Sequence, residues 1–96
     1  MITPYTIDAT AWTAISTAGQ AGTCWVESVT CGGGKLRIYH STLGVPALSV
    51  KDQGYPLWVP NKNFDAAQLE PDDANDIFYA IADQLDSVWE IRADVI

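Results

Sequence analysis

The chain has 96 residues and a net charge of −7, and 48% of its residues are hydrophobic. This length suits one domain with its own core and excludes a second, and four tryptophans can make that core substantial. Five lysines and arginines are too few for the clustered positive charge with which proteins bind nucleic acid or an anionic membrane surface. The sequence also lacks an apolar run of the roughly 20 residues that a membrane helix needs, and residues 1–4 have no feature of a signal peptide. We therefore expect one soluble domain over residues 1–96, made in the cytoplasm.

The negative charge is concentrated in the last third of the chain. Residues 1–64 carry three acidic and four basic residues, a net charge of +1, whereas residues 65–96 carry nine acidic residues and only Arg92, a net charge of −8. An acidic surface keeps a small protein soluble, and it can also meet a basic neighbour. Both interpretations stay open on the sequence alone.

The first ten residues mix polar and apolar side chains without a core pattern. They predict either a short edge strand or an extended N-terminal arm over residues 1–10 that reaches a neighbouring subunit. In the second case Tyr5 is a candidate contact with the partner. Residues 11–17 alternate in type and predict a short strand that ends at the small residues 18–22.

Three consecutive glycines, Gly32–Gly34, separate two β-rich runs. Glycine adopts positive φ without a Cβ clash, so we predict a β-hairpin with strands over residues 23–29 and 35–41. Side chains alternate on both strands, and the face that carries Leu36 and Ile38 is the predicted core face.

The two cysteines, Cys24 and Cys31, are too few for a secreted disulfide scaffold, and their spacing differs from that of a C-x-x-C motif. Cys24 has the position of a small core residue beside Trp25, so we expect a buried free thiol. A disulfide with Cys31 is the alternative, and it requires the glycine turn to fold back over the strand.

Between residues 42 and 64, turn residues interrupt every apolar run. Residues 47–50 predict a brief strand, and residues 57–59 predict another that ends at Pro60. Short strands separated by turns in this way predict an all-β antiparallel sandwich or barrel.

The tryptophans divide into two groups. Trp25 and Trp89 lie on regular strands and are predicted core residues. Trp58 lies between turn segments with Tyr55 nearby, so these two aromatic residues are candidate contacts for a ligand or a partner.

The C-terminal third fits two structures. Apolar residues recur at helical spacing after Pro71, which predicts an amphipathic helix over about residues 72–90 and an α+β fold. The same residues also predict a second hairpin, with strands over 77–82 and 87–96 joined by a turn at 83–86. In the hairpin, the residues facing the core are Trp89, Ile91, Ala93 and Val95.

Three stretches, Trp12–Trp25, Asn75–Ala80 and Ala93–Ile96, carry a resemblance. Through them the chain resembles small virion structural proteins of tailed bacteriophages, of the kind that decorate or cement the capsid. The stretches consist of packing and turn residues, so the resemblance implies no particular functional residue. It favours the hairpin over the helix in the C-terminal third.

Residues with catalytic or metal-binding chemistry are few. His40 is the only histidine and no G-x-S-x-G motif supplies a nucleophile, so we interpret it as a hydrogen-bonded residue at a strand end. An acidic group resembles a calcium loop only loosely, because it lacks the loop's glycine and terminal glutamate. The members of this group are Glu70, Asp72, Asp73 and Asp76. We therefore predict no catalytic, cofactor-binding or metal-binding residue.

Two classes of function follow. The first is a non-enzymatic virion protein, most plausibly a capsid decoration subunit that forms a homotrimer and binds the major capsid protein or another virion protein. Its place is the virion, assembled in the host cytoplasm. The alternative is a tail- or fibre-associated module that recognises a carbohydrate or a protein, which the aromatic residues favour.

Overall fold

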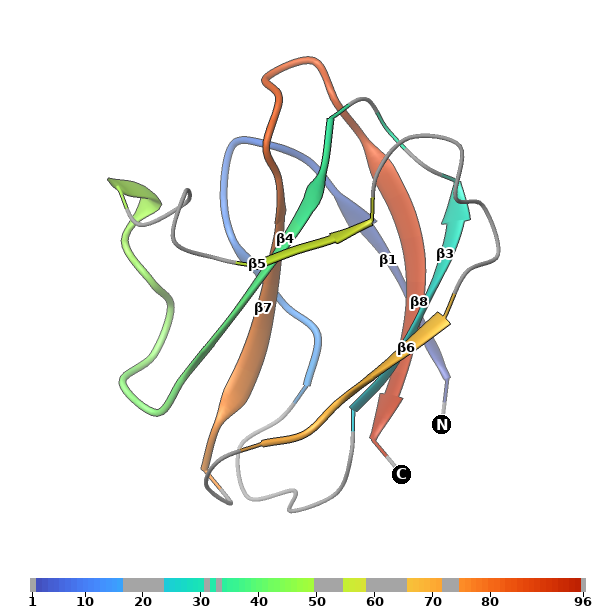
Figure 1. Cartoon of the computed structure of the whole chain (residues 1–96). Coiled ribbons are helices and arrows are strands. Elements are labelled where there is room, and N and C mark those ends of the chain that lie inside the picture. The colour runs from blue at the N-terminus through green and yellow to red at the C-terminus, as the bar shows by residue number, and fades with distance from the viewer. Residues whose placement is uncertain are drawn as a thin grey trace.

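The computed structural model of the chain is an all-β sandwich of two antiparallel sheets (Figure 1). It describes residues 2–16, 24–30, 32, 34–49, 55–58, 66–71 and 75–95, and for residues 55–58, 66–67 and 95 it describes the backbone alone. Sheet 1 contains, in spatial order, β1 (Thr3–Ile7), β8 (Trp89–Val95), β3 (Cys24–Thr30) and β6 (Ala66–Leu69). Sheet 2 contains β2 (Thr13–Ala14), β7 (Ile77–Ala82), β4 (Leu36–Ser41) and β5 (Tyr55–Trp58).

The predicted all-β class is confirmed. The alternative helix over residues 72–90 is wrong, because β7 and the start of β8 lie within that range. Within the part of the chain that the structure describes, there is no candidate for a membrane-spanning helix.

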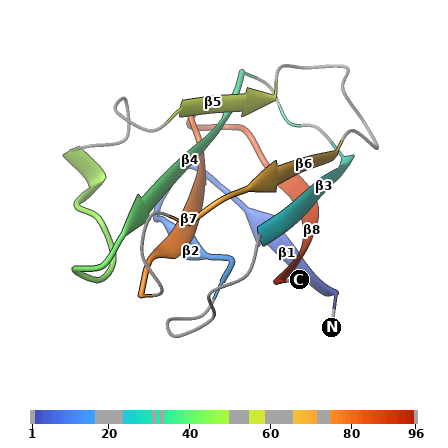
Figure 2. The same cartoon turned by 60° about the horizontal axis from the view of Figure 1, so that its bottom comes forward.

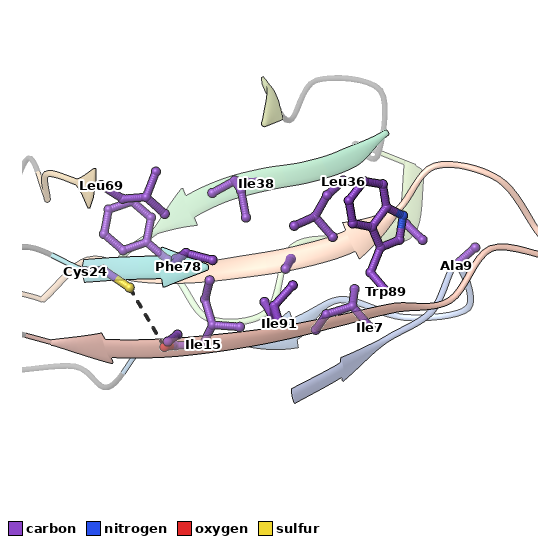
Figure 3. Close-up of a cluster of buried hydrophobic side chains, with 14 residues drawn as sticks. Ile7, Ala9, Ile15, Cys24, Leu36, Ile38, Leu69, Phe78, Trp89 and Ile91 are labelled. Atoms are coloured by element: carbon purple, nitrogen blue, oxygen red, sulfur yellow. Dashed lines mark hydrogen bonds between the residues drawn. The ribbon is translucent and has the colours of Figure 1, made fainter. Parts of the chain in front are cut away.

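The core lies between the two sheets, and one face of each central strand supplies it. Residues of β3, β4 and β8 alternate between buried and more exposed, as expected for strands with one face on a core. Trp89 lies near Leu36 at one end of this core, and Cys24 and Phe78 lie at the other end (Figure 3). The buried residues confirm the predicted inward faces of the strands that carry Leu36, Ile38, Trp89, Ile91 and Ala93.

Trp25 does not face the core, although its position on a regular strand predicted that it would. The buried residues of β3 are Cys24, Val26 and Ser28, so Trp25 has the opposite parity and is half-buried on the outer face of sheet 1. Its prediction as a core residue is wrong for that reason.

The N-terminal segment forms an edge strand, which is one of the two predicted alternatives. β1 pairs with β8 from Thr3 opposite Ala93 to Ile7 opposite Trp89. Ile7 and Ala9 are buried in the main core, and the carbonyl of Asp8 accepts a hydrogen bond from the N–H of Ala82 at 3.0 Å. Residues 3–9 therefore pack within their own domain and do not form a free arm.

β7 is buried on both faces. Phe78, Ala80 and Ala82 belong to the main core, whereas Tyr79 and Ile81 form a second cluster with Trp12 on the outer side of sheet 2. The strand predicted over residues 11–17 is present only as the two-residue β2. A hydrogen bond from the N–H of Ile15 to the carbonyl of Phe78 continues its pairing with β7.

The four strands of the two predicted hairpins exist, but the hairpins themselves are wrong, because the strands of each pair lie in different sheets. β3 belongs to sheet 1 and β4 to sheet 2, and β7 belongs to sheet 2 and β8 to sheet 1. One connection between the sheets runs from β3 to β4, where the structure describes Gly32, Gly34 and Lys35, and another runs from β7 to β8 over residues 83–88. We call these connections the first and the second arch. An arch lets two strands bury their apolar faces against each other across the sandwich, whereas a hairpin places both apolar faces on the same side of one sheet.

The two arches pack against each other at one end of the sandwich. A Cβ atom on Gly32 would overlap the Ser87 hydroxyl and would lie 2.7 Å from the carbonyl oxygen of Val88. Gly34 has a φ of +71°, and a Cβ atom there would overlap the Asp83 carboxylate. Gly32 is thus required for close approach, whereas Gly34 is required for both close approach and its backbone conformation.

Asp83 links the arches through polar contacts. Its carboxylate accepts a hydrogen bond from the N–H of Lys35 at 2.7 Å, and its own N–H donates to the Lys35 carbonyl at 3.0 Å. The guanidinium of Arg37 lies 3.7 Å from the same carboxylate. These contacts fix the second arch beside the start of β4.

Two predictions for the connection between β4 and β6 have different outcomes. The strand predicted over residues 47–50 is wrong, because Leu48 and Ser49 form a 3-10 turn and Val50 lies outside the described residues. The strand predicted near residues 57–59 exists as β5, although it begins earlier and includes Pro56. A proline is tolerated there because β5 is the edge strand of sheet 2 and its pairing with β4 is irregular.

The arch contact predicts unequal effects of alanine at two glycines that both have positive φ. Gly44 has a φ of +97° with no atom within 4 Å of an added Cβ, so Gly44→Ala should lower the free energy of unfolding by about 1–2 kcal/mol through backbone strain alone. Gly34→Ala should lower it by about 2–5 kcal/mol, because the methyl group also displaces the Asp83 carboxylate. Urea denaturation of both variants measures the difference, and equal losses would show that the arches do not pack closely.

Candidate functional site

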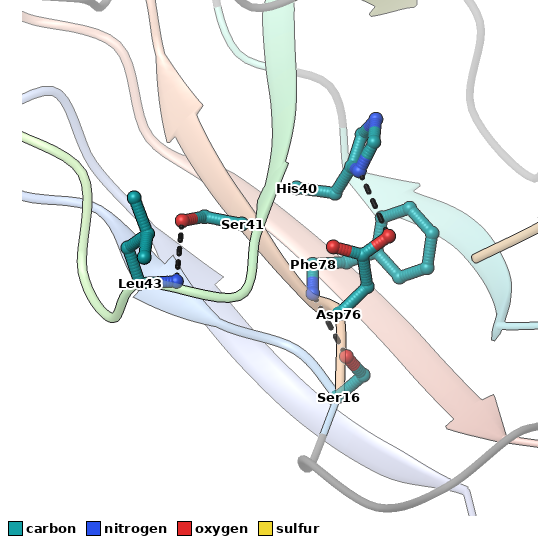
Figure 4. Close-up of polar contacts among 6 residues, drawn as sticks. All are labelled: Ser16, His40, Ser41, Leu43, Asp76 and Phe78. Carbon is teal, nitrogen blue, oxygen red and sulfur yellow. Dashed lines mark hydrogen bonds and ion pairs between the residues drawn. The ribbon is translucent and has the colours of Figure 1, made fainter. Parts of the chain in front are cut away.

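The only histidine is paired with a buried acid (Figure 4). His40, near the end of β4, has its Nδ1 3.1 Å from Oδ2 of Asp76, whose side chain is 6% exposed, and its ring lies 5.8 Å from that of Phe78. This geometry confirms the interpretation of His40 as a hydrogen-bonded residue at a strand end. The pairing with Asp76 was not predicted, because it depends on β4 lying beside β7 with His40 opposite Phe78.

The two serines nearest to this pair bond to the backbone. The Ser16 hydroxyl accepts a hydrogen bond from the N–H of Phe78 at 2.8 Å, and the Ser41 hydroxyl accepts one from the N–H of Leu43 at 3.0 Å. Ser41 also follows His40 directly, so the two side chains point to opposite faces of β4 (Figure 4). These contacts give His40, Ser16 and Ser41 roles in holding the end of the sandwich.

The acidic residues that loosely resemble a calcium loop do not form one group among the residues that the structure describes. Asp72 and Asp73 lie outside the described residues, and Asp76 pairs with His40. Among the residues that the structure describes, no group of three or more histidine, cysteine, aspartate and glutamate side chains is placed to hold a metal ion.

Cys24 is a buried free thiol, as predicted, while Cys31 lies outside the described residues. The Sγ of Cys24 lies 4.0 Å from the carbonyl oxygen of Ile15 (Figure 3). Burial, with a smaller contribution from the negative charge of Asp94, raises the pKa of the Cys24 thiol from 9.0 to about 11. Since the thiolate is the reactive form, this thiol is protected from oxidation and from alkylation in the folded protein.

The three residues predicted to contact a partner lie on two strands, one in each sheet. Tyr5 is in β1, where it is half-buried and packs against the main core. Tyr55 and Trp58 are in β5, and their side chains lie outside the described part of the structure. β1 ends the order of sheet 1 and β5 ends the order of sheet 2 at the other side of the sandwich (Figure 2).

Among the described residues, the most exposed leucine lies in the connection that follows β4, residues 42–49, which we call the apolar loop. Leu43 is 94% exposed, Val45 is 70% exposed and Leu48 is 52% exposed. None of the eight residues in this loop is charged. Sequence analysis missed this surface, because turn residues with scattered apolar side chains give no signal of which way those side chains point.

The apolar loop is attached to the body of the protein while its apolar side chains face solvent. The indole N–H of Trp12 donates a hydrogen bond to the carbonyl of Ala47 at 3.3 Å. Trp12 itself is buried in the outer cluster of sheet 2, with its ring 5.9 Å from that of Tyr39. The loop thus extends from the side of the sandwich (Figure 1) but is anchored on a packed aromatic cluster.

A second surface feature is an open depression of about 400 Å³ on sheet 1, which we call the edge depression. It lies where β1, the outermost strand, runs beside β8 and the end of β3. The residues that line it are Pro4, Tyr5, Thr6, Val29, Glu90, Ile91 and Arg92. Tyr5, one of the predicted contact residues, is part of this lining.

Comparison of the chain with models of protein families, with curated proteins and with solved structures found no match.

The raised pKa of Cys24 predicts slow labelling and a specific dependence on pH. In a Cys31→Ser variant, a thiol reagent at pH 8 should modify Cys24 only after denaturation. Because the folded state holds the thiol proton more tightly, its contribution to stability is complete below pH 9 and is lost as the pH rises toward 11. A Cys24→Ala variant should lack this loss when unfolding is measured across that range. Rapid labelling of the native protein would contradict the burial of the thiol.

Proposed function

We propose that this chain is a structural protein of a tailed bacteriophage virion, a decoration subunit that binds the outer surface of the head through its apolar loop. The partner is the major capsid protein or another virion protein. The resemblance of residues 12–25, 75–80 and 93–96 to small virion proteins supports the class of partner. The exposed side chains of Leu43, Val45 and Leu48 carry the proposal that the protein acts by docking.

The energetics of the apolar loop suit a docking surface. Burying one leucine or valine side chain that was exposed contributes roughly 1.5–3 kcal/mol, and Leu43, Val45 and Leu48 are all available for such burial. The hydrogen bond from Trp12 to Ala47 restricts the loop before binding, so less conformational entropy is lost on docking.

Three such side chains give weak binding for a single subunit, and repetition would strengthen it. Several copies held together bind a repetitive shell through high effective concentration. We therefore keep the homotrimer expected from the sequence as part of the proposal, and sedimentation of the purified protein measures it.

In this proposal the protein has no enzymatic activity. The contacts of the polar residues support this absence of activity. His40 of β4 pairs with Asp76, which precedes β7, and the hydroxyls of Ser16 and Ser41 accept hydrogen bonds from backbone N–H groups. Each of these contacts holds neighbouring segments of the fold.

A pair of matched substitutions tests the docking surface. Leu43→Asp places a charge in the apolar loop, whereas Leu85→Asp makes the same change at another exposed leucine, which is 82% exposed in the second arch. The arch adjoins the first residue of β4 and the loop follows its last residue, so the two sites lie at opposite ends of that strand. With purified heads that lack the protein, Leu43→Asp should weaken binding by at least about tenfold, and Leu85→Asp should bind like the unchanged protein.

The outcomes separate the two candidate functions. Equal binding by both variants would remove the apolar loop as the docking surface. Failure of the unchanged protein to bind heads, together with binding to glycans or to tails, would favour the tail-associated module instead.

A further inference from the structure

We propose that the edge depression binds the side chain of a lysine or an arginine of a partner protein. This inference does not depend on which partner the apolar loop contacts. It rests on the shape of sheet 1 at the end of β3, on the apolar lining there, and on the charge that remains after the internal ion pair is formed.

The shape arises from a β-bulge. The pairing of β3 with β8 passes from Ser28 opposite Ile91 to Thr30 opposite Glu90, so Val29 is an extra residue without a partner on β8. A bulge increases the local twist of a strand and redirects its side chains, and bulges often lie next to binding sites. The depression lies beside this bulge, with Pro4 and Val29 as part of its apolar lining. Its volume of about 400 Å³ is near the small end of the range for ligand sites, which suits one side chain better than a folded segment.

The available charge in the depression is negative. Nη2 of Arg92 is 3.1 Å from Oε2 of Glu27, and this ion pair offsets the positive charge of Arg92, although its Nε has no hydrogen-bond partner among the described residues. The carboxylate of Glu90 is exposed, and within the described residues its hydrogen bond is a long one of 3.5 Å from the Thr30 hydroxyl. Such a distance is at the limit of a hydrogen bond, so this carboxylate is available to a positively charged group.

An apolar wall beside an exposed carboxylate matches a side chain with an apolar stem and a positive tip. Lysine and arginine have this form, and they bury their methylene groups while the charge stays near water. The net charge of −7 attracts positively charged partners and disfavours anionic ones. β1 is an edge strand of sheet 1, so the depression lies at an edge where an extended segment of a partner can pair.

Titration with small probes tests this site directly in the intact protein. N-acetyl-lysine methylamide and N-acetyl-norleucine methylamide share the same apolar stem, and only the first carries a positive charge. In two-dimensional amide NMR spectra, the lysine probe should shift the signals of Thr6, Val29 and Glu90 most. The norleucine probe should bind about fivefold more weakly, as expected for the loss of one partly exposed charge pair.

Two variants with the same change of charge complete the test. Glu90→Gln should weaken binding of the lysine probe about fivefold. Glu70→Gln is the control, because Glu70 is exposed and follows Leu69, which lies opposite Cys24 at the far end of β3. It should change the affinity by less than about twofold, since exposed charges beyond about 8 Å are screened at physiological salt.

Three results would overturn the proposal. The first is equal binding of the two probes, and the second is an equal effect of the two variants. The third is tighter binding of N-acetyl-glutamate methylamide than of the lysine probe, which would assign the depression to Arg92 and to an acidic ligand.

Discussion

The close contact between the two arches is the interaction on which the rest of the fold depends. One arch joins β3 to β4 and the other joins β7 to β8, so their contact places β3 beside β8 in one sheet and β4 beside β7 in the other. Two glycines allow the arches to approach, and Asp83 links them through hydrogen bonds to both backbone groups of Lys35. Replacing a glycine therefore affects both sheets together, because each arch is connected to both.

The same arrangement determines which surfaces are left for binding. The inner strands β3, β8, β4 and β7 are held by pairing on both sides, and the apolar faces that they share form the main core. The edge depression lies at the outermost strand of sheet 1, and the apolar loop leaves β4 at the end away from the arches. Both candidate surfaces thus adjoin strands that are paired on both sides.

The sequence predicts much of the local structure and little of the strand pairing. The positions of β3, β4, β7 and β8 follow from alternation and β-propensity, and the inward faces of Leu36 and Trp89 follow from parity. Pairing could not be predicted, because a hairpin and an arch require the same alternation of side chains and the same turn residues. The glycines predict a turn for a hairpin and for an arch alike. Only the contacts of Gly32 with Ser87 and of Gly34 with Asp83 show why side chains are excluded there.

For the candidate sites, too, local features could be predicted and contacts between distant segments could not. The ordinary hydrogen-bonding role of His40 was predicted, but its partner Asp76 required the pairing of β4 with β7. Tyr5 is a predicted partner contact in the N-terminal segment. The structure places it at the edge depression, which the bulge in β3 helps to form. The apolar loop had no signal in the sequence, because neither the direction of its side chains nor its hydrogen bond to Trp12, 35 residues away, can be read from turn residues.

We propose that this protein docks on a phage head through residues 42–49. An electron cryo-microscopy reconstruction of heads carrying the protein tests it most directly, because it shows which surface faces the shell. We expect density for the sandwich on the outer surface, with Leu43 and Val45 against the shell and the arches directed away from it. Heads without such density, or a sandwich that contacts the shell through the arches while residues 42–49 face solvent, would rule out docking through the apolar loop.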